Sequence, residues 1–265
     1  MSEKLGEEIA IETAKAVAVE GYKDTLQPAL KAVGAIFALP FQAIDAALSK
    51  AKLWVVEKQY NYERTRQLLA EKLQYTPEDQ IVPPENYVAV PALQQIAYCF
   101  DSDELREMYA NLLANSMNKV VKNGVHPGFV EIIKQLTPDE AKMLRYLYEN
   151  RLVPTIGIMV HKKSHEKVIV KQLFTNIMEL CKCENTNGYE KATDNLIRLG
   201  LVEISDKQCL ADKTKYEPLK NHPDSLKDKK ELESLENVAK VEFVEGYMGL
   251  TYFGDSFCSI CLKTQ

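Results

Sequence analysis

The sequence lacks the short motifs by which common enzyme classes are recognised. It contains no glycine-rich loop to cradle a phosphate, no H-E-x-x-H for a catalytic zinc and no G-x-S-x-G turn for a nucleophilic serine. Its four histidines have no acidic or nucleophilic residue at a motif spacing; they are His126, His161, His165 and His222. We therefore expect a protein that is not an enzyme and that needs no cofactor.

A hydrophobic run long enough to cross a bilayer is also missing. The apolar stretch at residues 26–39 (LQPALKAVGAIFAL) is short of the roughly 20 residues that a membrane helix needs, and Asp45 and Lys50 interrupt the pattern beyond it. The N-terminus has no basic segment followed by an uninterrupted apolar one, as a secretory signal would have. With six cysteines in 265 residues, this predicts a cytoplasmic protein with reduced thiols.

The chain has little excess charge of either sign. It carries 33 lysines and arginines against 38 aspartates and glutamates, a net charge of −5, so bulk attraction to nucleic acid is not expected and any such contact would be local. A hydrophobic content of 46% and a charged content of 27% are typical of a soluble globular protein. The length exceeds that of a usual single domain and predicts two domains.

The first half of the chain has helical patterns in three segments. Residues 1–24 predict a weak helix, and residues 25–75 predict a long helical hairpin with a thin apolar stripe. We favour packing of this stripe within the chain over a seam between two copies, because thin stripes more often serve a local bundle. Residues 76–136 comprise a connector at 76–91, expected to be extended because of its four prolines, and a central helical core.

The most sustained helical pattern lies within residues 101–136. Its apolar residues recur at spacings of three and four, which predicts one buried stripe with Leu112 and Leu113 near its middle. Asp101 is the expected N-cap, and Gly124 is expected just beyond the end of the first helix. The polar residues expected on the opposite side are Arg106, Glu107, Asn111, Asn115, Asn118 and Lys119.

A second unit is expected over residues 137–265. The tetrapeptide Thr-Pro-Asp-Glu at 137–140 has the form of a capping box with proline at the first helical position. Residues 205–240 are charged without a sustained apolar period and predict a long loop, with room for one short helix, that folding does not need but that has a binding role. Asp255 is expected to cap a last helix. The strands expected in this unit are 152–160, 201–204, 241–244 and 249–253.

Two phrases in this unit resemble a winged helix domain. They are NLIRLGLVEI (195–204), a helix that turns into a wing strand, and GLTYFGDSFCSICL (249–262), a return from the wing into a last helix. The resemblance implies that the helix at 190–199 is the one that enters the major groove in DNA-binding members. Because its charges cancel, we favour protein contact or scaffolding for it. These charges are Lys191 and Arg198 against Glu190 and Asp194.

Six basic residues are candidates for contact with nucleic acid or another anion. Four of them fall within residues 161–171, which we interpret as leading into a helix. We favour a solvated helix face over an anion site, since charge runs on helices usually face water. The six candidates are Lys162, Lys163, Lys167, Lys171, Lys191 and Arg198.

Two pairs of close cysteines are weak candidates for a metal site. Tetrahedral zinc sites are often built from two thiolate pairs, and Cys181 with Cys183 and Cys258 with Cys261 offer such pairs. The spacing of the first pair is unusual for zinc, and the second pair lies on an apolar helix, where cysteine behaves as a small hydrophobe. We therefore expect no metal.

Residues 90–144 resemble the abortive infection alpha family of bacteria. The phrases that carry the resemblance are DELREMYANLLANSM, HPGFVEIIKQL and TPDEA, and NLIRLGLVE fits as well. The resemblance covers residues 25–262 and implies a role in bacterial defence against phage. It brings no catalytic residues.

The expected fold is mainly α, with a helical N-terminal region followed by a winged helix-like α+β domain that has a long charged wing insertion at 205–240. The expected function is a non-enzymatic role in phage defence through protein contacts or self-association. Two alternatives stay open. One is nucleic-acid binding by the winged helix-like end, and the other is a membrane-acting effector that uses the apolar residues 26–48 without spanning the bilayer.

Overall fold

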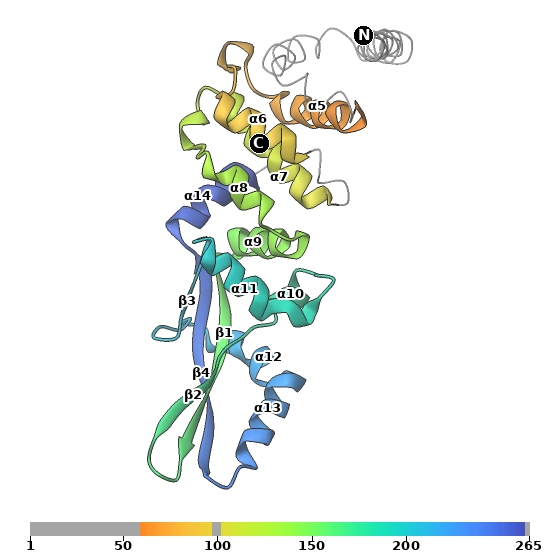
Figure 1. Ribbon diagram of the computed structural model, residues 1–265. Helices are drawn as coiled ribbons and strands as arrows, with labels where there is room; N and C mark the ends of the chain where they lie inside the picture. The colour runs from red at the N-terminus through yellow and green to blue at the C-terminus, as the bar shows by residue number, and fades with distance from the viewer. Residues whose placement is uncertain (1–58, 97–101, 263–265) are drawn as a thin grey trace, which may run out of the picture.

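The computed structural model describes residues 59–96 and 102–262 of the chain. Most helices gather at one end of the molecule, and an antiparallel sheet forms the other end with α12 and α13 beside it (Figure 1). The described part is therefore α+β. The expected helix at 1–24, the first part of the expected hairpin at 25–75 and the apolar residues 26–48 lie outside the described residues.

The helical end is built around α7 (Asp103–Met117), which contacts α5 (Gln59–Leu73), α6 (Asn86–Ile96) and α8 (Gly128–Lys134). The expectation that residues 76–91 are extended throughout was wrong, because α6 begins at Asn86 and contains Pro91. Burial of five apolar residues on α6 outweighs the hydrogen bond that proline removes. These are Val88, Ala89, Ala92, Leu93 and Ile96.

Helix α7 is buried over most of its surface rather than along one stripe. Leu112 and Leu113 are fully buried, as predicted. The prediction that Asn111 and Asn115 face solvent was wrong, since their exposed fractions are 2% and 5%. Their side-chain amides donate to the carbonyl oxygens of Cys261, at 2.9 Å, and of Ile260, at 2.7 Å. They thus satisfy carbonyls at the end of a distant helix.

Both ends of α7 differ from the prediction. The N-cap is Ser102, whose hydroxyl accepts from the N–H of Leu105 at 3.2 Å, rather than Asp101. The helix ends at Met117, well before Gly124, because the chain there pairs with the connector: Asn118 forms a β-bridge with Ile81. Apart from this bridge, the described residues before 136 contain no strand, as expected.

The second part of the chain begins with α9 (Pro138–Asn150), and its predicted capping box is present. The Glu140 carboxylate accepts from the Thr137 N–H at 2.7 Å, and the Thr137 hydroxyl accepts from the Glu140 N–H at 3.2 Å. The elements that follow are β1 (Leu152–Lys162), β2 (Lys167–Phe174), α10 (Ile177–Leu180), α11 (Tyr189–Arg198), β3 (Val202–Ser205), α12 (Glu217–Lys220), α13 (Pro223–Glu233), β4 (Val238–Leu250) and α14 (Tyr252–Cys261). Short 3-10 turns complete the series at Glu78–Gln80, Lys122–Gly124, Thr186–Gly188 and Lys213–Tyr216.

The four strands form one antiparallel sheet in the order β2-β1-β4-β3. The predicted helix face at 161–171 was wrong, because these residues form the β1–β2 hairpin, in which Val168, Ile169 and Val170 follow one another. Three consecutive β-branched residues favour strand over helix.

The last strand and helix also differ from the prediction. The two strands expected at 241–244 and 249–253 are one strand, β4, which ends at Leu250, so Tyr252 and Phe253 open α14. Strand β4 continues through Gly246. Only glycine fits at this position, because a Cβ would lie 2.3 Å from the carbonyl oxygen of Ser205. The N-cap of α14 is Thr251 rather than Asp255.

Residues 205–240 are not the dispensable loop that the sequence predicted. They contain α12 and α13, and Tyr216 and Leu219 are fully buried against Ile156 and Phe174 of the sheet. Helix α13 packs on β4 (Figure 1). The apolar residues of this segment are too sparse for a helical period, but they become part of a core once the sheet is present.

One hydrophobic cluster runs from Leu69 on α5 to Leu262 beyond α14, and therefore includes residues on both sides of position 137. Helix α14 contacts both α7 and α9. The division into two domains at this position stays a prediction. Among the described residues, no helix combines the length and the hydrophobicity that a membrane crossing requires.

Candidate functional site

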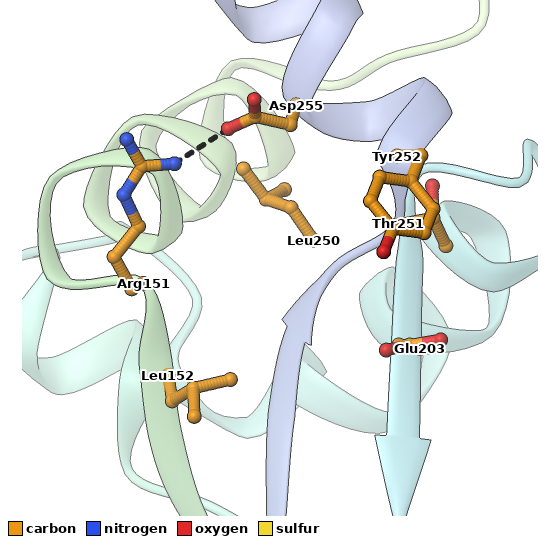
Figure 2. Close-up of a pocket in the computed structure, with 7 residues that line it drawn as sticks. All are labelled: Arg151, Leu152, Glu203, Leu250, Thr251, Tyr252 and Asp255. Carbon is orange, nitrogen blue, oxygen red and sulfur yellow. Dashed lines mark hydrogen bonds and ion pairs between the residues drawn. The ribbon is translucent and has the colours of Figure 1, made fainter.

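An open cleft of about 470 Å³ lies where the end of α9 and the start of β1 meet the start of α14 and the end of β4 (Figure 2). Strand β3 supplies Glu203 to the lining of this cleft. The lining combines a cation, two carboxylates, an aromatic ring and apolar side chains. The lining residues are Arg151, Leu152, Glu203, Leu250, Thr251, Tyr252 and Asp255.

Arg151 is positioned by the end of α9. It is the C-cap residue, and its φ of 67° is a backbone angle that residues other than glycine rarely adopt. Its N–H donates to the Leu147 carbonyl at 2.8 Å. The guanidinium lies over the Tyr148 ring at 5.3 Å and its Nη1 donates to Asp255 Oδ1 at 2.6 Å. Both side chains of this pair are about half exposed or more, so the pair contributes little stability and can exchange partners.

Tyr252 is held at the mouth of the cleft by the first turn of α14. The Thr251 hydroxyl accepts from the Gly254 N–H at 2.9 Å and donates to the Gly200 carbonyl at 2.6 Å. Gly254 packs so closely on the Leu201 carbonyl, 1.9 Å from an ideal Cβ position, that a side chain cannot fit there. This fixed turn leaves the Tyr252 side chain fully exposed.

The neighbouring Phe253 anchors the same turn to the helical end of the molecule. Its ring lies 5.6 Å from Phe129 and 6.1 Å from His126, and Phe129 in turn packs edge-to-face on Phe257 at 5.2 Å. Aromatic contacts of this kind add to the burial of apolar area. The backbone that carries Tyr252 is therefore rigid while its side chain is in water.

The structure does not bring the six predicted basic residues together on one surface. Four lie on the β1–β2 hairpin, where Lys162 pairs with Glu166 at 2.9 Å and Lys171 with Asp228 at 2.7 Å. The other two, Lys191 and Arg198, lie on α11, and Arg198 donates to the side chains of Asn195 and Gln135. Lys163 and Lys167 are exposed.

The two cysteine pairs lie on different elements. Cys258 and Cys261 are fully buried in α14. Cys183 approaches the Asp139 carbonyl at 3.7 Å, and burial raises the pKa of the Cys181 thiol to about 12 and that of Cys183 to about 11. Within residues 59–96 and 102–262, no three His, Cys, Asp or Glu side chains are arranged to hold a metal.

Sequence reasoning missed the residues of the cleft. Tyr252 was expected in a strand and Arg151 was not singled out, because its positive φ is visible only in the structure and an arginine at a helix end gives no signal of it. The spacing of Thr251 and Gly254 does give a signal, because a threonine N-cap accepts from the N–H three residues later.

Three comparisons with known proteins bear on identity. No curated protein matches the chain. A solved structure, that of an uncharacterized protein from the hydrocarbon-degrading marine bacterium Alcanivorax borkumensis SK2, is similar over 51% of this chain and 92% of that chain, with 16% identity and a TM-score of 0.38, which is too low to indicate a shared fold. The family model described as abortive infection alpha matches residues 57–261, most of the sequence. The chain thus belongs to the abortive infection alpha family.

Proposed function

We propose that this protein takes part in abortive infection, the defence of bacteria against phage, as a cytoplasmic, non-enzymatic component that acts through protein–protein contacts. Family membership supports the link to abortive infection. The observation that supports the contact mechanism is the fully exposed Tyr252 on a rigid turn, across the cleft from Arg151 (Figure 2). Tyrosine and arginine are enriched among the residues that contribute most binding energy at protein interfaces.

The chemistry of the cleft suits a basic side chain of a partner protein. Glu203 and Asp255 supply carboxylates, and the Tyr252 ring supplies an aromatic face for a cation. An incoming lysine or arginine would compete with Arg151 for Asp255, an exchange that the exposure of this pair permits. Leu152 and Leu250 would contact the aliphatic part of such a side chain.

A winged helix-like arrangement of the second part is included in this proposal. The helices α9, α10 and α11 and the strands β3 and β4 occur in the order expected for three helices, a first wing strand and a returning wing strand, and α14 is the last helix. The β1–β2 hairpin lies between α9 and α10 in the sequence, α12 and α13 lie between β3 and β4, and β4 pairs with both β1 and β3. On α11, the helix that would face DNA, Glu190 and Asp194 offset Lys191, and Arg198 is engaged by Gln135. This balance favours protein contact over groove reading.

The test compares two exposed tyrosines. Tyr252→Ala removes the cleft residue, and Tyr75→Ala removes a tyrosine of 78% exposure after α5. Each variant is expressed in a bacterial host that the wild-type protein protects, and plaque formation by phage is counted. Truncation of a central interface residue costs about 2 kcal/mol of binding free energy, which should lower the affinity for the partner roughly thirtyfold.

We expect Tyr252→Ala to lose protection while its thermal unfolding midpoint stays at the wild-type value, and Tyr75→Ala to keep both. Glu203→Gln removes the negative charge of one cleft carboxylate and so measures its contribution to partner binding. We expect this variant to weaken protection. Full protection by both Tyr252→Ala and Glu203→Gln would rule out the cleft as the point of contact.

A further inference from the structure

Strand β2 forms one edge of the sheet and is separate from the cleft. Three consecutive side chains on it are substantially exposed: Val168 at 38%, Ile169 at 38% and Val170 at 48%. In Figure 1 the β1–β2 hairpin projects from the end of the molecule opposite the helical end, with α13 beside the other strands. An exposed apolar edge of this kind offers unpaired backbone groups to a further strand.

The register of the hairpin shows which backbone groups point outward. The Lys162 N–H donates to the Glu166 carbonyl at 2.8 Å, and the pairs then continue as His161 with Lys167, Val160 with Val168 and Met159 with Ile169. Because hydrogen-bonded and non-hydrogen-bonded pairs alternate between antiparallel strands, the backbone of Val168 faces β1. The N–H and carbonyl of Ile169 therefore face away from the sheet. The regular alternation ends at this residue, because the register with β1 shifts between Ile169 and Lys171.

Positive charge is concentrated at the beginning of this edge. Among the described residues, Lys163 and Lys167 have no carboxylate partner within ion-pair distance. Acidic side chains nearby are already engaged: Glu166 pairs with Lys162, and Glu242 contacts both Lys240, at 2.6 Å, and His161, at 2.7 Å. Hydrogen bonds from Lys240 and His161 lower the pKa of Glu242 to about 2, so it stays ionised.

We propose that β2 binds an extended peptide of a partner protein as an added antiparallel strand, with acidic residues of the peptide beside Lys163 and Lys167. Backbone hydrogen bonds along an edge strand supply affinity, and side-chain contacts supply specificity. Because an antiparallel peptide has its C-terminal end at the start of β2, the acidic residues follow its apolar ones in sequence.

The charge of the β2 edge distinguishes an acidic peptide from two other possible occupants, a second copy of the chain and a nucleic acid. Lysines on a sheet edge discourage pairing with a second copy that carries the same lysines, whereas acidic side chains neutralise them. A nucleic acid would gain nothing from Val168, Ile169 and Val170, and Lys162 and Lys171 are already paired. The combination of an apolar edge with two unpaired lysines fits an acidic strand best.

The test uses a fluorescent synthetic peptide of alternating valine and threonine that ends in three glutamates, and a matched peptide that ends in three lysines. Anisotropy of each is followed with the full chain at low and high salt. The acidic peptide should bind and lose affinity with salt, and the basic one should not bind. Absence of binding by the acidic peptide, or equal binding of both, would overturn the proposal.

Two pairs of variants locate the site. Ile169→Pro removes the outward N–H without touching the ladder to β1, and Ile169→Thr keeps that N–H. We expect the proline variant to lose roughly tenfold in affinity, the equivalent of one hydrogen bond, and the threonine variant to change little. Lys163→Glu with Lys167→Glu should reverse the preference to the basic peptide without affecting folding. The matched control is Lys191→Glu with Lys207→Glu, two exposed lysines on α11 and after β3, which should leave the preference unchanged.

Two further measurements exclude the other occupants. Light scattering should give the same molar mass for the wild type and Ile169→Pro, and a dimer that only the proline variant loses would assign the edge to a second copy. Duplex DNA should not displace the bound peptide. Displacement by DNA at low concentration would assign the lysines to nucleic acid and overturn the proposal.

Discussion

Substitution of Asn111 by alanine should destabilise the fold through a hydrogen bond that spans 150 positions. The side-chain amide of Asn111 donates to the Cys261 carbonyl at 2.9 Å, and the exposed fraction of Asn111 is 2%. Alanine removes the donor that Asn111 supplies to this buried carbonyl at the end of α14. Leaving a buried polar group unsatisfied costs about 1 to 3 kcal/mol.

Asn150→Ala is the matched control. Asn150 makes a hydrogen bond of the same kind and length, 2.9 Å, to the Tyr146 carbonyl, but it is exposed, so water replaces the lost donor. Alanine improves helix propensity by up to about 0.7 kcal/mol, which leaves an expected loss of about 0.3 to 2.3 kcal/mol for Asn111→Ala and no loss, or a small gain, for Asn150→Ala. Urea unfolding followed by circular dichroism measures both. Equal free energies of unfolding for the two variants would refute the role assigned to the buried bond.

Three further predictions follow from burial and charge. Leu113→Ala should lower the free energy of unfolding by about 2 to 5 kcal/mol, because Leu113 is fully buried, and an unchanged urea midpoint would contradict this. Replacement of residues 207–236 by a short glycine-containing turn should cost at least about 3 kcal/mol through the loss of buried Tyr216 and Leu219, so a wild-type thermal midpoint would be evidence against their place in the core. Asp139→Asn should destabilise at neutral pH, with a gap that closes as the pH falls below 3.8, the ordinary pKa of the carboxyl.

The pH dependence expected for Asp139→Asn follows from the lowered pKa of the Asp139 carboxyl. Burial alone would raise the pKa of Asp139, but the backbone N–H groups of Glu184 and Asn185, at 3.1 and 3.3 Å, and the nearby Lys142 outweigh it. The ionised carboxylate therefore stabilises the fold above the ordinary pKa and loses this contribution as the pH falls through the lowered value. A difference between wild type and variant that persists at acid pH would assign the effect to packing instead.

Features set by near neighbours in the chain could be predicted from the sequence. The capping box of Thr137 and Glu140 depends on four consecutive residues, and Gly200 ends α11 with a φ of 73° because only glycine adopts this conformation without strain. The buried positions of Leu112 and Leu113 follow from helical spacing on α7. Each of these is decided before distant parts of the chain meet.

Features set by distant contacts could not be predicted in this way. Asn111 appears polar and exposed on a helical projection, and only the arrival of α14 makes it a buried donor. Gly246 resembles a break between strands until Ser205 is placed against it. The candidate cleft is of the same kind, since Arg151 and Asp255 are separated by 104 positions and no local pattern relates them.

The docking of α14 on α7 has a consequence for the order of events during synthesis. Helix α7 leaves the ribosome about 145 residues before Ile260 and Cys261, whose carbonyls receive the amides of Asn115 and Asn111. Until then, the nascent chain lacks the two carbonyls of α14 that accept from these amides. Chains that terminate before residue 260 lack both carbonyls and the buried side chains of Ile260 and Cys261, so we expect them to be unstable and open to proteolysis rather than partly active.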